Sequence, residues 1–471
     1  MKRLIAFASA VLVVIALFAL SGRELSMTRA TLAASEHTPQ RTANSTNEIQ
    51  ELIKLVEFFC KNIYPRPSIK ECIDRIKHAV GSSADPHSAY YTLEEHMEQM
   101  VDREGKFGGL GIEVIKQSNT VSQVVVMGVI DDTPAYKAGL MVGDVITHIG
   151  APITDEHIPT TSLKNIRDAV NLIRGTPGTK ATIRVSRKGV QDAILFTIVR
   201  EEIKIVQVDG GLIVENEKTF AVIRDKSFLM NNASEVEKKF KELKQKAGGH
   251  LSGLIVTVES NPGGLLHEAY NLSRLFIDHT EDIVLMRGNE RIEQYIPSGR
   301  RLFSKFSGDI TGGLPMLVVV NGASASASEI FARAMQHHGR AVVAGTSRTY
   351  GKGVVQSIEE LPDSAGAVKY TSAEYLIGSM DDWVPVQCIG VEPDILFTYP
   401  GLKPREYLRE CAQNGHVNTG GPMANAPIRP SIKDANAELY KKAEEMLEAY
   451  KRYNLPKLLA EEEKRKTLEQ Q

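Results

Sequence analysis

The chain has 471 residues, of which 42% are hydrophobic, 24% charged and 6% aromatic. This length exceeds what one hydrophobic core usually serves, so we expect two or three domains. The formal net charge of -2, with no Lys/Arg block interleaved with aromatic residues, argues against nucleic acid as a partner.

The N-terminus carries the pattern of an export segment. Lys2 and Arg3 precede an apolar run from Leu4 to Leu20 that only Ser9 interrupts. The run is long for a signal-peptide core and short for a membrane span. Basic residues at the start keep that end in the cytoplasm and send the rest across. We therefore expect residues 1–35 to be a signal peptide or signal anchor with a polar tether, and the chain to be exported, either periplasmic or anchored in the inner membrane facing the periplasm. A buried core helix is the alternative.

Residues 36–102 are expected to form a helical N-terminal region, because Ile49, Leu52, Ile53, Val56 and Phe59 recur at helical spacing. The four cysteines form no CxxC pair, so no metal site is predicted. In an oxidising compartment, Cys60 and Cys72 could bridge across the turn that contains Pro65 and Pro67. Small buried hydrophobes are an equally good interpretation of these cysteines.

Short strands and glycine turns are predicted for residues 103–200, with one helix at Asn165 to Arg174. The segment Gly109-Leu110-Gly111-Ile112 opens a strand with small residues. Its backbone N–H groups can receive a terminal carboxylate, while the strand edge pairs with an extended peptide and the helix forms the other wall of the groove.

Strand–helix alternation follows in residues 201–400. Continuous aliphatic strands such as Leu254 to Val258 and Met316 to Val320 alternate with helices such as Ala233 to Lys246. This pattern predicts an α/β core whose sheet is covered on both faces. Residues 401–471 are expected to be a charged helical extension, and helical termini of this kind would allow a homo-oligomer.

Two loops after buried strands can carry chemistry. In Asn261-Pro262-Gly263-Gly264, glycines without a Cβ leave backbone N–H groups able to face a ligand, although a plain tight turn explains the pattern too. In the alternating Ser/Ala string from Ser324 to Ser328, a sharp strand-to-helix turn would expose a serine oxygen at the positive end of a helix. Capping of that helix by Ser326 or Ser328 is the alternative.

A nucleophilic serine needs a base. His337 and His338 lie about three helical turns along, roughly 16 Å away at about 1.5 Å per residue, and are too distant. Lys352, between Gly351 and Gly353, is the better candidate, because burial would lower its pKa and let it accept a proton. Gln356 would share its strand face and bond the amine. An exposed turn lysine is the alternative; a phosphate loop fails because Gly353 replaces the Ser/Thr of that motif.

These strings occur in the order found in carboxy-terminal processing peptidases, the tail-specific proteases, which the chain resembles from about Ile49 to Tyr399. The matching segments are Asp85-Pro86-His87-Ser88, Gly109-Leu110-Gly111-Ile112, Ala138-Gly139-Leu140 with Gly143-Asp144, Asn261-Pro262-Gly263-Gly264, Ser324 to Ile330, Tyr350-Gly351-Lys352-Gly353 with Gln356, and Gly390-Val391-Glu392-Pro393-Asp394-Ile395.

The resemblance implies a role for each matching position. Ser326 would be the nucleophile, Lys352 the general base and Gln356 the residue that orients it. The N–H of Ala327, with one from Gly263 or Gly264, would form the oxyanion hole. Arg174 would couple the PDZ domain to the protease. The implied fold is a crotonase-like (ClpP/crotonase-type) α/β core with an inserted PDZ domain and helical N- and C-terminal segments, without cofactor or metal.

One departure weakens the match locally, because the acidic Glu259 stands where the family usually has a basic residue, an arginine. The function implied is that of an exported serine endopeptidase that recognises nonpolar C-terminal tails of proteins through its PDZ domain. A catalytically inactive PDZ scaffold is the first alternative. An acyl-CoA enzyme of the crotonase type is the second, and it would need neither Lys352 nor the PDZ-like module.

Overall fold

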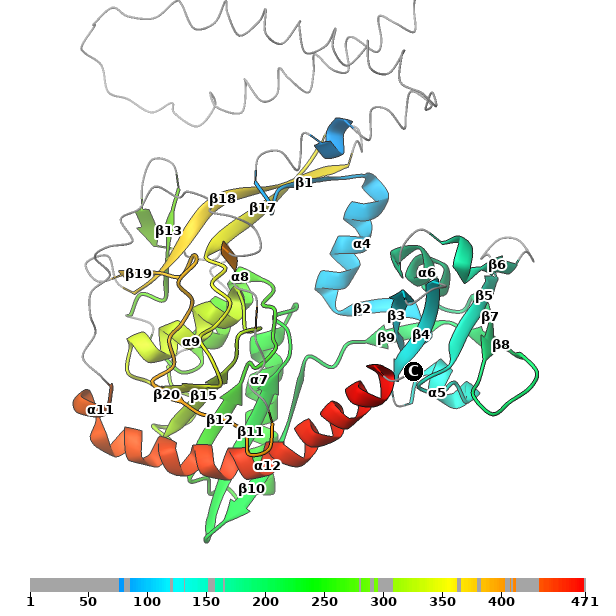
Figure 1. Cartoon of the computed structure of the whole chain (residues 1–471). Helices are drawn as coiled ribbons and strands as arrows, with labels where there is room; N and C mark the ends of the chain where they lie inside the picture. The colour runs from blue at the N-terminus through cyan, green and yellow to red at the C-terminus, as the bar shows by residue number, and fades with distance from the viewer. Residues whose placement is uncertain are drawn as a thin grey trace, which may run out of the picture. The chain divides into compact units, whose positions relative to one another are not determined.

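The computed structural model (Figure 1) describes residues 76–79 and 85–469, except 119–121, 131, 151–156, 164–165, 279–280, 289–291, 295–307, 362–365, 379–382, 403–406, 408–409 and 412–431. The chain divides into two units, Met1–Ala84 and Asp85–Gln471, and the second unit holds the sheets of the fold. The predictions for residues 4–20, Cys60 and Cys72 lie outside the described residues. Within the described part, no helix combines the length and the apolar character needed to cross a membrane.

The first module of this unit is an antiparallel sheet in the order β3-β4-β5-β7-β8, with β6 paired to β5. Alternate strand residues such as Val124, Ile146 and Ile183 are fully buried and pack with Ala169 and Ile173 of α6. The elements are β3 (Ile112–Ser118), β4 (Ser122–Val129), α5 (Pro134–Ala138), β5 (Val145–Gly150), β6 (His157–Pro159), η1 (Thr160–Ser162), α6 (Ile166–Ile173), β7 (Lys180–Ser186) and β8 (Ile194–Val199).

A short ladder frames this module where the chain enters and leaves it. β2 (Lys106–Gly109) pairs antiparallel with β9 (Glu201–Lys204). Just before β9, the buried Arg200 donates to the carbonyl oxygens of Leu172 and Ile173 at 2.9 and 2.8 Å. These are carbonyls that the end of α6 leaves without helical partners. Burial lowers the pKa of Arg200, and its bonds fix the helix that borders the predicted peptide groove.

A six-stranded sheet in the order β10-β11-β12-β15-β16-β20 forms the centre of the second module. β10 pairs antiparallel with β11, and every later pair is parallel. Its strands and helices are β10 (Val208–Glu215), β11 (Lys218–Asp225), α7 (Asn232–Lys246), β12 (Gly253–Thr257), α8 (Leu266–Arg274), β15 (Met316–Val320), α9 (Ala327–His337), β16 (Val342–Gly345) and β20 (Ile395–Leu396).

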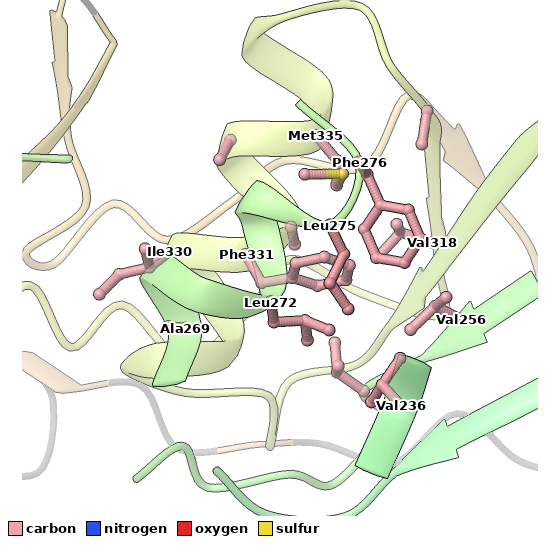
Figure 2. Close-up of a cluster of buried hydrophobic side chains, with 14 of the residues drawn as sticks. Val236, Val256, Ala269, Leu272, Leu275, Phe276, Val318, Ile330, Phe331 and Met335 are labelled. Carbon is pink, nitrogen blue, oxygen red and sulfur yellow. The ribbon is translucent and has the colours of Figure 1, made fainter. Parts of the chain in front are cut away.

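Both faces of this sheet are covered, as the aliphatic strands predicted. On one face, Val256 and Val318 pack against Leu272 of α8 and Phe331 of α9 (Figure 2). On the other face, Ile255, alternating with Val256 along β12, packs against α12 (Ala437–Glu469), the long red helix of Figure 1. Each such side chain contributes roughly 1.5–3 kcal/mol when fully buried. The apolar stripe of the C-terminal helix is therefore buried within its own chain.

Glu259, the departure from the family pattern, ties α12 to the end of β12. Its carboxylate accepts hydrogen bonds from the hydroxyl groups of Tyr450 at 2.6 Å and Tyr399 at 3.3 Å. Asn454 donates to the Tyr399 hydroxyl at 3.0 Å and accepts from Arg224 at 2.9 Å. Burial raises the pKa of Glu259. The acid here serves the packing of the C-terminal helix.

A second sheet stands beside the first. β18 (Ala367–Gly378) is its longest strand and pairs with β1 (Ala89–Tyr91), β13 (Val284–Arg287), β17 (Val354–Glu360) and β19 (Trp383–Pro385), while β14 (Ile292–Gln294) pairs with β13. α4 (Leu93–Glu104) follows β1, and α11 (Ile432–Ala435) precedes α12. Because β1 and β17 both pair with β18, the segment just before β1 is held near β17 and the loop that leads into it, which contains Lys352.

Candidate active site

The three serines in the turn between β15 and α9 differ in burial and in hydrogen bonding. Ser324 and Ser328 are fully buried, and their hydroxyl groups donate to the carbonyl oxygens of Val258 at 2.7 Å and Asn261 at 2.9 Å. Ser326 alone of the three is partly exposed. The outer two serines therefore fasten the turn to the loop after β12, and the middle one is available for chemistry.

The backbone of Ser326 is strained. Its φ of 55° and ψ of -115° lie in a region that non-glycine residues rarely occupy. The next residue begins α9, so the serine stands at the positive end of the helix. The N–H of Ser326 donates to Glu329 Oε2 at 2.8 Å, which holds the turn in this conformation.

The glycine loop after β12 lies directly against this turn. A Cβ on Gly263 would stand 2.7 Å from the Ala325 oxygen and 2.8 Å from Ser326 Cβ, so only glycine fits. The N–H of Gly263 donates to Asn261 Oδ1 at 2.9 Å. Gly264 bridges to Phe228 through its neighbours' atoms, Gly263 O and Leu265 N, so its own N–H points away from Phe228. Of the two glycines, Gly264 is therefore the better candidate for the second N–H donor of the predicted oxyanion hole, beside Ala327.

The buried Asp225 holds the glycine loop in place through Asn261. Asn261 Nδ2 donates to the carbonyl oxygen of Asp225 at 3.1 Å, and Asn232 Nδ2 donates to Asp225 Oδ1 at 3.0 Å. Burial raises the pKa of Asp225 to about 8. Asp225 fixes the side-chain amide of Asn261, and that amide in turn fixes Gly263.

Lys352 occupies the loop that leads into β17 and is half-buried. Burial lowers the pKa of its amine, the charge of Glu410 raises it, and Lys369 lowers it again. Gly353, next to it, donates its N–H to Gln387 Oε1 at 2.6 Å, and a Cβ there would meet the Gln387 backbone nitrogen at 2.2 Å. The glycine on this side is thus a close-approach residue, and the lysine is not a solvated turn charge.

Glu329 joins the serine turn to the lysine loop. The same Oε2 that accepts from Ser326 accepts from the N–H of Lys352 at 2.9 Å, while Oε1 accepts from Thr349 Oγ1 at 2.6 Å and Gly351 N–H at 2.7 Å. Glu329 is fully buried, and burial raises its pKa to about 7 although four donors favour the ionised form. The backbones of Ser326 and Lys352 are therefore within two hydrogen-bond lengths of each other.

Tyr375 of β18 closes the same link from the other side. Its buried hydroxyl contacts the carbonyl oxygens of both Lys352 and Ser326, the latter at 3.2 Å. Sequence reasoning missed both Glu329 and Tyr375. Glu329 left a weak signal, since it stands three residues after Ser326 in capping-box spacing, whereas Tyr375 left none.

The side chains of the predicted dyad are not bonded to each other in the structure. Among the described residues, no hydrogen bond joins Ser326 Oγ to Lys352 Nζ, and none joins Gln356 to that amine. The amide of Gln356 instead donates to Thr371 Oγ1 at 3.2 Å on the neighbouring strand. Catalytic hydrogen bonds often form only when substrate is bound.

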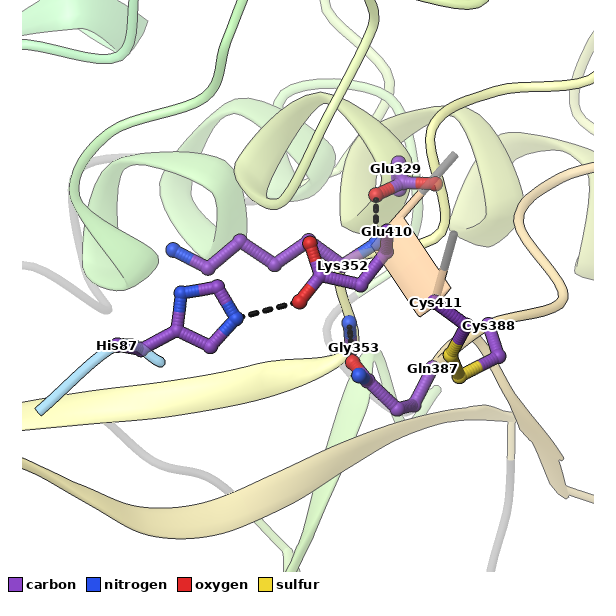
Figure 3. The surroundings of a disulfide bond; sticks show 8 residues. All are labelled: His87, Glu329, Lys352, Gly353, Gln387, Cys388, Glu410 and Cys411. Carbon is purple, nitrogen blue, oxygen red and sulfur yellow. Dashed lines mark hydrogen bonds and ion pairs between the residues drawn. A yellow bond between two sulfur atoms is a disulfide. The ribbon is translucent and has the colours of Figure 1, made fainter. Parts of the chain in front are cut away.

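Segments remote in sequence surround Lys352 (Figure 3). His87 Nε2 bonds the carboxylate of Glu410, which is fully buried. The next residue, Cys411, forms a disulfide with Cys388. From the sequence, only the pair Cys60 and Cys72 was considered as a bridge. Pairing those two leaves Cys388 and Cys411 as the remaining pair, which is the signal that could have found this disulfide.

In the PDZ-like module, the carbonyl oxygens of Leu110 and Gly111 accept from Ala135 and Ile130 N–H, each at 2.9 Å. The predicted carboxylate loop is thus anchored through its oxygens, and α6 lies beside β3, which continues from it. Arg174 places its guanidinium 4.3 Å from the centre of the Phe107 ring, beside the β2–β9 ladder. Within the described residues, no group of three or more His, Cys, Asp or Glu side chains could hold a metal.

Known proteins share this combination of modules. The family model "Peptidase family S41" matches residues 219–397, and the model "PDZ domain" matches residues 108–195. The carboxy-terminal-processing protease of Bartonella bacilliformis is 33% identical over 387 residues, which are 80% of this chain and 82% of the relative. The chain belongs to peptidase family S41.

The chain is also similar to two further proteins that are named as C-terminal processing proteases. The carboxy-terminal processing protease CtpA of Bacillus subtilis is 27% identical over 394 residues, 83% of this chain and 78% of that protein. The structure of a photosystem II D1 C-terminal processing protease is similar over 73% of this chain and 86% of its own, with 24% identity and a TM-score of 0.44. The two family models and the two similar proteases compared by sequence show that this S41 chain is a serine-type peptidase with a PDZ domain.

Proposed function

We propose that the chain is an exported endopeptidase that binds nonpolar C-terminal tails in its PDZ groove and cleaves peptide bonds through Ser326, with Lys352 as general base. One observation carries the proposal. The partly exposed serine of the 324–328 string stands on a strained turn whose N–H shares a single carboxylate oxygen, that of Glu329, with the N–H of Lys352. A half-buried lysine with a lowered pKa is a suitable base at neutral pH.

The chemistry follows from these positions. Lys352 takes the Ser326 proton, and the serine oxygen attacks the peptide carbonyl carbon. The N–H groups of Ala327 and Gly264 receive the negative oxygen of the tetrahedral intermediate. The proton passes to the leaving amine, an acyl-enzyme remains on Ser326, and water hydrolyses it. The meeting of two strand-end loops at helix N-termini also supports the crotonase-like classification.

The remaining parts of the proposal concern recognition and location. The loop Gly109-Leu110-Gly111-Ile112, anchored through the carbonyl oxygens of Leu110 and Gly111, would receive the tail carboxylate on its N–H groups. Arg174, beside the entry ladder, would transmit tail binding to the protease. Export, with membrane association through residues 4–20, rests on the basic start and apolar run, and self-association on the helical termini. N-terminal sequencing of soluble and membrane fractions tests the export segment.

The mechanism is tested with Ser326→Ala. We expect cleavage of casein and of an unstructured peptide with a nonpolar tail to fall at least about a thousandfold, while binding of the tailed peptide persists. Ser252→Ala, an exposed serine of the same domain, is the matched control and should cleave at the wild-type rate. Wild-type cleavage by Ser326→Ala would refute the assignment.

A further inference from the structure

Three contacts hold the backbone of the Glu410 segment next to the lysine loop. The backbone N–H of Glu410 donates to the carbonyl oxygen of Tyr350 at 3.2 Å, two residues before Lys352. The disulfide of Cys411 leads to Cys388, whose N–H donates to Gly351 O at 2.8 Å. The segment that carries Glu410 is thus fastened to the two residues that immediately precede the lysine.

A fourth contact holds the side chain itself. His87 bonds the Glu410 carboxylate, and Asp85 holds the His87 turn by accepting the N–H of His87 at 2.7 Å and of Ser88 at 3.1 Å. Burial of Asp85 is outweighed by these bonds and by the Ser88 hydroxyl, so its pKa is lowered and it remains an acceptor. Figure 3 shows the His87–Glu410 pair next to the Lys352 side chain.

The charges that face Lys352 come from several elements. Glu410 and Glu329 are the acidic groups that raise the pKa of Lys352, and Lys369 of β18 is the basic group that lowers it; His87 and Tyr375 are the other titratable groups packed there. Glu329 accepts four hydrogen bonds from backbone and Thr349, including the lysine's own N–H, so it acts on the loop. Glu410 lies on the segment beside the lysine side chain, where its charge opposes the cost of burying an ammonium.

We propose that Glu410 is a positioning residue for Lys352: held by His87 and by the Cys388–Cys411 disulfide, it stabilises the ammonium that forms when the lysine takes the Ser326 proton. This rests on the proposed function, in which Lys352 is the base. Without Glu410 the pKa of Lys352 would be lower. The amine would then stay neutral down to a lower pH, but it would be a weaker base. Both effects are measurable, and a purely structural residue would produce only a uniform loss.

The test follows the rate at which a fluorophosphonate labels Ser326, from about pH 5 to about pH 10. This range includes the pKa of free histidine, and its centre lies below the pKa of free lysine. In this reaction the Ser326 oxygen bonds phosphorus, fluoride leaves and Lys352 takes the proton. For Glu410→Gln we expect the acid limb of the profile to move roughly one unit toward acid and the alkaline rate to fall about tenfold. Glu392→Gln, an exposed carboxylate paired with Arg348, should leave the profile unchanged.

The double variant Cys388→Ser/Cys411→Ser carries the same expectation without altering Glu410, so the proposal stays testable if Glu410→Gln does not fold; fluorescence of Trp383, the single tryptophan, reports folding of the core. An acid limb that stays in place or moves toward alkali in a folded variant overturns the proposal. Absence of Ser326 labelling in the wild type, or labelling of Lys352→Ala at the wild-type rate, would instead overturn the proposed function.

Discussion

Ser326 and Lys352 belong to the same site but are held in different ways. The serine turn is fastened to one neighbouring loop, through the buried hydroxyl groups of Ser324 and Ser328. The lysine loop is bonded by two remote segments, through Gln387 and Glu410, and His87 from a third segment holds Glu410 in turn. The serine side is thus a local construction at the end of one sheet, and the lysine side depends on the whole module being assembled.

Two groups cross between these sides, the carboxylate of Glu329 and the hydroxyl of Tyr375. Both groups bond the main chain of Ser326 and of Lys352, so the relative position of the two proposed catalytic residues is set through backbone atoms. Among the described residues, no hydrogen bond joins the two side chains themselves. Substitutions on the serine side and on the lysine side should therefore have separable effects on activity. Substitutions of the two bridging residues, Glu329 and Tyr375, should have the largest effects.

The strongest test of the crossing is Glu329→Ala. It leaves four donors without an acceptor in a buried place, at about 1–3 kcal/mol each if water does not replace the carboxylate. We expect the rate of Ser326 labelling by a fluorophosphonate to fall about a thousandfold and the core to unfold at clearly lower urea, followed by Trp383 fluorescence. The exposed Glu359→Ala on β17 is the control and should change neither. A folded Glu329→Ala protein with wild-type labelling would show that the shared carboxylate does not align the dyad.

The sequence predicted the serine side well because its pattern is local. Alternating Ser and Ala after a buried strand, and consecutive glycines after the preceding strand, sit in stretches of a few residues, and the structure brings those stretches together. For the outer serines, the sequence offered only a capping alternative for Ser328 and no role for Ser324. Their actual role, bonding Val258 and Asn261, depends on two parallel strands lying side by side, which a linear pattern does not specify.

The lysine side was predictable only in part. The flanking glycines identified Lys352, and Asp85-Pro86-His87-Ser88 was recognised as a family signature without a role. The partners of these residues come from positions hundreds of residues away, such as His87 with Glu410, and leave no periodicity in the sequence. The helical C-terminal segment was predicted, but the packing of Ala443 and Met446 of its apolar face on the chain's own sheet was not; self-association through the helical termini stays a prediction.

A narrower test breaks the serine side alone. Gly263 has φ of 98°, and a Cβ there would press on the Ala325 oxygen and Ser326 Cβ. Gly263→Ala should push the glycine loop off the serine turn and lower kcat about a hundredfold by displacing the oxyanion donors, with less effect on KM. Gly339→Ala is the matched control, because Gly339 has φ of 60° but nothing within 4 Å of the added carbon. Equal losses in the two variants would mean that backbone strain, not contact with Ser326, is responsible.

The smallest effect is expected for Gln356→Ala on the lysine side. The resemblance predicts that Gln356 orients the amine, but in the resting structure its amide donates to Thr371. If that bond is its main role, Gln356→Ala and Thr371→Val should each lower kcat/KM by about tenfold or less, because each removes one partly exposed hydrogen bond between β17 and β18. A hundredfold loss in Gln356→Ala with a normal rate in Thr371→Val would instead show that the amide turns to Lys352 when substrate binds. The two variants thus separate a strand-pairing role from a catalytic one without disturbing the serine side.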